Sequence, residues 1–262
     1  KTVKNGANMS TVLGMVELCW GDIGLALSIP RQGLGNAAVA AVATPEQKAR
    51  WGQVWAAMAI TEPGAGSDSA AIRTTARLEG NEWVINGEKI YVTAGERATA
   101  VVVWATLDRN MGRAAIKSFF VPKGSPGMQL VRLDKKLGIR ASDTAVLSFN
   151  DCRIPKDNIL GSPEIDTKKG FGGVMQTFDN TRPIVAAMAL GVARASLEVT
   201  ETFLKEAGVD TRMRGSRWTQ HAAAAELHRM KAELEAARLL TIKAAWMADN
   251  GIPNSVEASM AK

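Results

Sequence analysis

The middle of the chain constrains the fold most strongly, because the spacing of its hydrophobic residues changes there. Between about residues 57 and 150, short segments rich in β-branched and aromatic residues follow one another with turn residues between them. No helical pattern separates the segments, so successive strands are expected to pair directly in an antiparallel barrel or sandwich. The expected strands span residues 74–78, 82–85, 88–93, 100–105, 118–121, 128–133 and 145–149.

One turn within this region carries a specific local signal. The dipeptide Asn86-Gly87 stands between two of the expected strands. Asn-Gly is favoured in two-residue turns because both residues tolerate positive φ, so we predict a hairpin there.

Helical patterns flank the middle region on both sides. Residues 182–205 and 221–250 carry Ala, Leu and Met at helical spacing, and Pro45 with Thr44 before it is typical of a helix start. The predicted fold is α+β and multidomain. Its parts are a helical N-terminal part over 1–56, a β-barrel or sandwich domain over 57–162, and a C-terminal helical bundle over 163–262.

Composition excludes several classes of protein. Of the 262 residues, 46% are hydrophobic and 22% are charged, as in globular proteins, and no uninterrupted apolar run has the length of a membrane span. The net charge of +6 would suit an anionic ligand, but the basic residues are scattered and do not alternate with aromatic ones, so nucleic-acid binding is not expected. Two histidines and two cysteines offer no metal-ligand spacing, and so few cysteines favour a reducing compartment.

The segment "MAITEPGAGSD", residues 58–68, has four possible interpretations. Its G-x-G lacks the third glycine of a dinucleotide fingerprint, no Gly-Lys-Ser/Thr follows for a phosphate loop, and no G-x-S-x-G elbow is present. A plain surface turn would explain the proline and glycines. It would not explain why Thr61, Glu62, Ser67 and Asp68 surround them, so a loop that wraps a ligand stays open.

Three segments, in order, resemble the acyl-CoA dehydrogenase family. They are "AITEPGAGSDSAAIRTTARLEGNEWVINGEKIYVTAG" (59–95), "KLGIRASDTAVLSFNDCRIPKDNILG" (136–161) and "FDNTRPIVAAMALGVARASLE" (178–198). The likeness spans nearly the whole chain, and "WGDIGLALSI" (20–29) is similar to the family's helical N-terminal domain. The resemblance implies the same order of helix, β and helix, with FAD as cofactor.

The resemblance also implies residues that contact the cofactor and the substrate. In the family the first signature lies along the flavin, and Ser67 matches a position that hydrogen-bonds the cofactor or the pantetheine arm of the substrate. Asp179 and Arg182 match positions near the thioester of the acyl-CoA, although Arg182 could instead be a structural ion-pair partner. The cofactor contacts implied are Met58, Ile60, Thr61, Gly66, Ser67, Tyr91, Val92 and Thr93.

The implied reaction is α,β-dehydrogenation of an acyl-CoA in fatty-acid oxidation. It needs a carboxylate base, and the resemblance places that glutamate beyond Lys262, because Thr181 occupies the alternative position beside Arg182. We therefore expect no catalytic base within these residues. A catalytically silent partner subunit, an acyl-CoA-binding scaffold and an acyl-CoA oxidase remain alternatives.

The resemblance further implies a setting and partners. Electron-transfer flavoprotein is the expected electron acceptor, and a dimer or tetramer, of one kind of subunit or two, is the expected assembly. The bacterial cytoplasm or the mitochondrial matrix is the expected location. Around residues 208–218 the family's Arg-Phe-Gly segment is replaced by "VDTRMRGSRW", which puts the cofactor contact from a neighbouring subunit in doubt.

Overall fold

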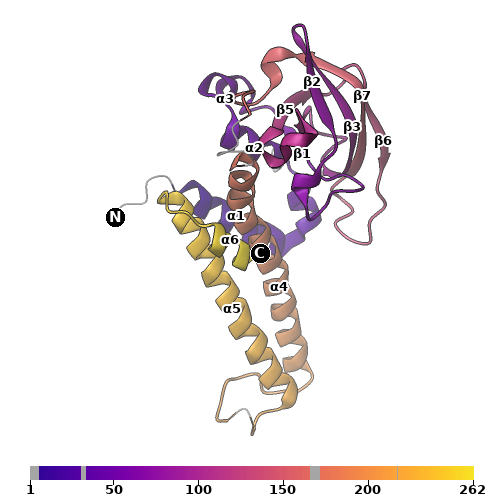
Figure 1. Cartoon of the computed structure of the whole chain (residues 1–262). Coiled ribbons are helices and arrows are strands. Elements are labelled where there is room, and N and C mark those ends of the chain that lie inside the picture. Colours follow the sequence, from indigo (N-terminus) through magenta and orange to yellow (C-terminus); the bar gives the residue numbers. More distant parts are fainter. Residues whose placement is uncertain (1–5, 31–33, 166–171, 217) are drawn as a thin grey trace. The chain divides into compact units, whose positions relative to one another are not determined.

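The computed structural model describes residues 6–30, 34–165, 172–216 and 218–262. The chain divides into two compact units, one of Leu27–Phe178 and one of Lys1–Ala26 with Asp179–Lys262. Figure 1 shows the order of their elements along the chain. The division into three domains at residues 56 and 162 stays a prediction.

The unit of Leu27–Phe178 contains one seven-stranded sheet with two short helices before it. The strand order is β1-β4-β2-β3-β7-β6, and β5 pairs with β4 outside this path. The helices are α2 (Leu34–Val42) and α3 (Pro45–Trp51), with short 3-10 turns η1 (Ser69–Ala71), η2 (Arg109–Ala115) and η3 (Lys156–Asn158). The strands are β1 (Ala56–Ala59), β2 (Thr75–Glu79), β3 (Glu82–Thr93), β4 (Ala100–Thr106), β5 (Ile116–Pro122), β6 (Met128–Leu133) and β7 (Thr144–Pro155).

The sheet is mainly antiparallel, as its sequence predicts, and the fold class is confirmed. Two pairings are parallel, however: β1 pairs with β4 from Ala56↔Ala100 onward, and β2 meets β4 at Thr75↔Thr106. The sequence did not predict these pairings, because a pattern of hydrophobic residues identifies strands without saying which distant strands become neighbours.

The hairpin predicted at Asn86-Gly87 is wrong, because β3 runs without interruption through both residues. The chain turns instead at Gly80, where φ is +61°, and β2 and β3 pair on either side of it. Gly87 is needed for a different reason, since a Cβ there would collide with Thr74. Asn86 is bonded to Asp151 on β7, whose backbone nitrogen donates to Asn86 Oδ1 over 2.8 Å.

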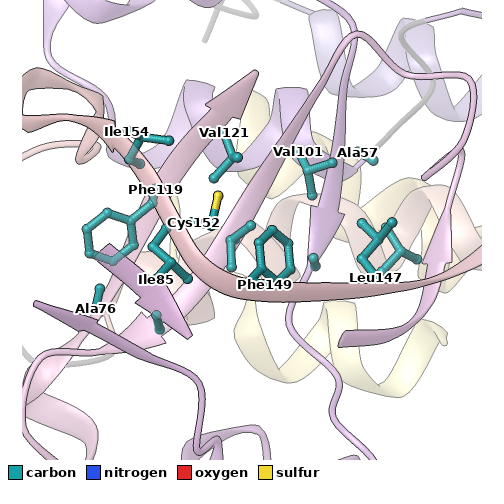
Figure 2. Packing of buried hydrophobic residues seen from close by; sticks show 14 of the residues in the cluster. Ala57, Ala76, Ile85, Val101, Phe119, Val121, Leu147, Phe149, Cys152 and Ile154 are labelled. Atoms are coloured by element: carbon teal, nitrogen blue, oxygen red, sulfur yellow. The ribbon is translucent and has the colours of Figure 1, made fainter. Parts of the chain in front are cut away.

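The core of this unit lies on both faces of the sheet. One cluster joins alternate residues of β2, β3, β4, β5 and β7, and Figure 2 shows several of its members, among them Phe119, Phe149 and Leu147. A second cluster packs α2, α3 and β1 against the other face of β4, where Trp51 stacks on Phe120 with ring centroids 4.6 Å apart. The helix start predicted at Thr44 is confirmed by a complete capping box with Gln47.

The other unit is helical. Its elements are α1 (Ala7–Ser28), α4 (Gly172–Glu206), α5 (Ala222–Asp249) and α6 (Ser255–Ala261), and α1 and α4 each extend a few residues past its boundary. Met15 and Cys19 of α1 pack with Ala187 of α4 and Ala245 of α5 in a small buried cluster. His221 caps the start of α5 by accepting from the backbone nitrogen of Ala223.

Two helical stretches, Ala7–Ser28 and Thr177–Glu206, are long and apolar enough to cross a membrane by length and composition alone. Core helices of soluble proteins meet the same criteria, and both stretches contribute residues to the small cluster of the helical unit. Only 28% of each stretch is buried, so packing among the described residues accounts for part of their hydrophobicity.

Replacing Leu147 by Ala should lower the free energy of unfolding by about 2–5 kcal/mol, because Leu147 is fully buried and the change leaves a cavity. Leu130 is its cross-strand partner on β6 but is 44% exposed, so Leu130→Ala should cost less than about 1 kcal/mol. Urea unfolding of both variants measures the difference. Equal losses would contradict the burial of Leu147 in the core and the exposure of Leu130 on the terminal strand β6.

Candidate functional site

The segment 60–68 forms a loop that begins where β1 ends. The backbone nitrogens of Glu62 and Ala65 each donate to the other residue's carbonyl, at 3.0 and 3.1 Å, and so close a tight turn over Pro63-Gly64. Asp68 then caps the short turn η1 by accepting from the backbone nitrogen of Ala70 over 3.2 Å. Two of the acidic residues noted in the sequence therefore shape the loop itself.

A buried ion pair joins this loop to β3. Lys89 Nζ lies 2.8 Å from Glu62 Oε1, and it also donates to the carbonyl of Ile60 over 3.0 Å. Lys89 is completely buried and Glu62 is 7% exposed. A buried lysine is rare unless its charge is paired and hydrogen-bonded, and both conditions are met here.

The carboxylate of Glu62 also accepts hydrogen bonds from Arg73 and Thr74. Its Oε1 accepts from the backbone nitrogen of Thr74 at 2.9 Å and from the Thr74 hydroxyl at 2.5 Å, and its Oε2 accepts from the backbone nitrogen of Arg73 at 2.6 Å. Burial raises the pKa of Glu62, but the Lys89 charge and these hydrogen bonds outweigh it, so the pKa lies below its ordinary value. Glu62 is therefore an anion at neutral pH.

Burial shifts the pKa of Lys89 in the direction opposite to its effect on Glu62. It lowers the pKa of Lys89 to about 8, against the charge and the hydrogen bond of Glu62, which raise it. The ammonium group is thus protonated at neutral pH, and the pair is ionic there.

The pair places two parts of the first family signature, residues 60–62 and 89–91, side by side. Beside the contacts of Lys89, the backbone nitrogen of Ile90 donates to the carbonyl of Thr61 over 2.9 Å. Thr61 is half-buried, and Tyr91, next along β3, is 66% exposed with φ of +58°. The sequence-predicted residues Thr61 and Tyr91 therefore belong to adjacent segments, and the Tyr91 ring is accessible.

The other predicted cofactor residues divide into three groups by their burial. Ile60 and Val92 are buried, each in one of the two cores of this unit, so their side chains have no access to a ligand. Met58 is half-buried against the second cluster. Gly66, Ser67 and Thr93 are exposed.

The predicted substrate residues Asp179 and Arg182 lie in the helical unit. Arg182 Nη1 is 2.8 Å from Asp179 Oδ1, and the Ser255 hydroxyl donates to Asp179 Oδ2 over 2.5 Å. This geometry is compatible with both roles considered for Arg182, that of an ion-pair partner and that of a substrate contact. Thr181, beside it, is buried and carries a hydroxyl rather than a carboxylate.

Three polar residues of these arrangements were missed from sequence alone: Lys89, Thr74 and Ser255. A signal existed for Lys89, since it stands within a strand whose neighbours Ile85 and Val92 face the core. Within the described residues, no group of three or more His, Cys, Asp or Glu side chains is placed to hold a metal ion.

In the altered segment around 208–218, Arg212 forms an ion pair with a residue of the same segment. Its guanidinium forms two bonds of 2.7 Å to the carboxylate of Asp210. Arg217 lies outside the described residues.

Replacing Thr74 by Val should lower the free energy of unfolding at pH 7 by about 1–3 kcal/mol, since it removes a buried donor to the Glu62 carboxylate. The folded-state pKa of Glu62 is depressed, so the stability that this anion contributes is present above its ordinary pKa of 4.5 and is lost as pH falls through the folded value. The difference between wild type and Thr74→Val should shrink over that range. Urea unfolding at pH 7 and below pH 4.5 measures it.

Thr75→Val is the matched control, because Thr75 follows directly and is only half-buried. It should change stability by less than about 0.5 kcal/mol at either pH. A Thr74→Val loss that is independent of pH would contradict a hydrogen bond to an ionised Glu62.

Two models of protein domains match most of the chain. Residues 57–152 match the model of the acyl-CoA dehydrogenase middle domain, and residues 168–262 match that of the acyl-CoA dehydrogenase C-terminal domain. The chain is 42% identical to the mitochondrial short-chain specific acyl-CoA dehydrogenase of Bos taurus over 84% of its own length and 53% of the relative's. It thus spans about half the length of the curated relatives it matches.

Solved structures show the same likeness. Butyryl-CoA dehydrogenase from Megasphaera elsdenii superposes with a TM-score of 0.85 at 32% identity, over 98% of this chain and 67% of that one. A chain solved in a study of the electron transferring flavoprotein of Acidaminococcus fermentans gives a TM-score of 0.83 at 35% identity, covering 95% of this chain and 66% of that one. The family is FAD-dependent, as the resemblance implied. This chain belongs to the acyl-CoA dehydrogenase family.

Proposed function

We propose that the protein catalyses FAD-dependent α,β-dehydrogenation of an acyl-CoA thioester to the trans-2-enoyl-CoA. The observation that carries this proposal is the join between two parts of the first signature, 60–62 and 89–91, which brings the half-buried Thr61 and the exposed Tyr91 onto adjacent segments. The names of the relatives support a short acyl chain as substrate.

The residues at this edge fit a flavin. An exposed aromatic ring at Tyr91 offers a stacking surface, and hydroxyl groups at Thr61, Ser67 and Thr93 offer donors for a polar ring edge or a diphosphate. At Gly64 and Gly66 nothing crowds the backbone, so a ligand can approach it closely. When bound, FAD supplies the acceptor for the two electrons removed from the substrate.

The 60–62 segment contributes a hydrogen-bond donor that is held in position before the flavin binds. The carbonyls of Ile60 and Thr61 are both already bonded to β3, so the Thr61 hydroxyl extends from a backbone that is held in place. A donor that does not need to reorient stabilises developing negative charge more effectively than a mobile one. Glu62 is held by the backbone around it and serves the loop rather than the reaction.

The substrate side is assigned to the helical unit. Arg182 and Asp179 are proposed to orient the thioester end of acyl-CoA, and Ser67 to bond the pantetheine arm or the cofactor. The proton at Cα must pass to a carboxylate, which Thr181 does not provide.

The proposed setting follows the relatives. Lipid oxidation is the proposed process, with electron-transfer flavoprotein as the electron acceptor and a dimer or tetramer as the assembly. The mitochondrial matrix or the bacterial cytoplasm is the proposed location.

The protein, expressed at its full length, should bind FAD and turn yellow, and it should bleach when butyryl-CoA is added without oxygen. Absorbance at the flavin band follows the reduction. Protein that cannot be reconstituted with FAD would contradict the proposal. Bound FAD that is not bleached by any acyl-CoA would favour the silent partner subunit or scaffold, and peroxide formed in air would favour an oxidase.

Replacing Tyr91 by Ala should weaken FAD binding about tenfold, the loss typical of removing one aromatic stacking surface. Stability should change little, because the side chain is exposed. Leu78→Ala, which removes an exposed side chain on β2, is the control and should leave FAD binding unchanged. Quenching of flavin fluorescence measures both affinities. Equal affinity of wild type and Tyr91→Ala would remove Tyr91 from the cofactor site.

A further inference from the structure

The path of β3 near Tyr91 departs from regular alternation. Lys89 pairs with Leu147 of β7, and Val92 pairs with Ala145, so two residues of β3 oppose the single residue Val146. This arrangement is a β-bulge, which adds one residue to one strand and re-aims the side chains after it.

The bulge decides which way Tyr91 faces. In a regular strand Lys89 and Tyr91 would share a face, because side chains alternate with a period of two. Here Lys89 and Val92 both face the core and are almost completely buried, while Tyr91 is 66% exposed. The backbone at Tyr91 has φ of +58°, which is uncommon for a bulky residue and persists only where the surroundings enforce it.

The contacts that enforce this geometry converge on Lys89. Immediately before the bulge, its ammonium group bonds the carbonyl of Ile60 and the carboxylate of Glu62. Within the bulge, Ile90 bonds the carbonyl of Thr61. Three consecutive loop residues, 60–62, are therefore attached to two consecutive residues of β3. The two bonds from Lys89 use its side chain, and the bond from Ile90 uses its backbone.

We propose that Lys89 is a positioning residue of the cofactor site, which holds the 60–62 segment against the bulge of β3 and so keeps Thr61 and Tyr91 in place to receive the flavin. This assignment rests on the proposed function, since it deepens the role of that site. Lys89 itself is fully buried and touches no ligand. It acts through the carbonyl of Ile60 and through the orientation of Tyr91.

The chain offers a direct readout, because Tyr91 is its only tyrosine. Incorporation of 3-fluorotyrosine at position 91 alone gives a single ¹⁹F resonance, which reports the surroundings of Tyr91 without FAD. Three variants are compared with the wild-type chain: Lys89→Met, the double variant Glu62→Gln with Lys89→Met, and Ile154→Ala. FAD affinity is measured on the same samples by quenching of flavin fluorescence.

Each variant isolates one property. Lys89→Met removes the bond to Ile60 and leaves Glu62 buried without its partner, which destabilises the fold. The double variant removes both charges, so it should recover stability, but it still lacks the donor to Ile60. Ile154→Ala opens a cavity beside Trp83, at the opposite end of β3, and lowers stability without touching the bulge.

The proposal predicts that both Lys89 variants move or broaden the Tyr91 resonance and weaken FAD binding about tenfold. Ile154→Ala should leave the resonance in place. An unchanged resonance in the Lys89 variants would overturn the proposal, as would full recovery of the resonance and of FAD affinity in the double variant, since Lys89 would then contribute stability alone. Failure of the wild-type chain to bind FAD would count against the proposed function, and the resonance would still decide the role of Lys89.

Discussion

A lysine and a glutamate paired inside the sheet unit connect its loop, its strand and its site. Burying two isolated charges would be costly, and removing one partner of such a pair typically costs about 3–5 kcal/mol. Here Glu62 accepts hydrogen bonds from Lys89, Thr74 and Arg73, and Lys89 donates to both Glu62 and Ile60. These hydrogen bonds offset the cost of removing the two charges from water. They also hold the loop after β1 against β3.

This constraint links stability to function. The space beside the loop glycines Gly64 and Gly66 is open, while the pair fixes the residues immediately before them. The β3 bulge then turns Tyr91 outward beside Thr61. A flavin needs an aromatic surface and donors that are already in position, so a buried ion pair supports an exposed aromatic side chain here.

Most helices and strands and the family could be predicted from the sequence. The contacts between residues far apart in the chain could not. The periodicity of residues 182–205 and 221–250, the cap at Thr44 and most strand positions are local properties, and the structure confirms them. The turn at Asn86-Gly87 was wrong because the same dipeptide that favours a hairpin also suits a close approach to Thr74. The parallel pairing of β1 with β4 and the burial of Lys89 depend on contacts across 27 or more positions in the chain, which no local pattern contains. The resemblance supplied the candidate site, and the structure added the residues that hold it together.

The central claim is that the edge formed by Thr61 and Tyr91 receives the flavin. A crystal structure of the protein with FAD tests it most directly. The account predicts the isoalloxazine ring against Tyr91, with a polar atom of the ring within hydrogen-bond distance of the Thr61 hydroxyl, and the bond from Lys89 to the Ile60 carbonyl intact. A flavin bound elsewhere, with Tyr91 still in solvent, would contradict the account.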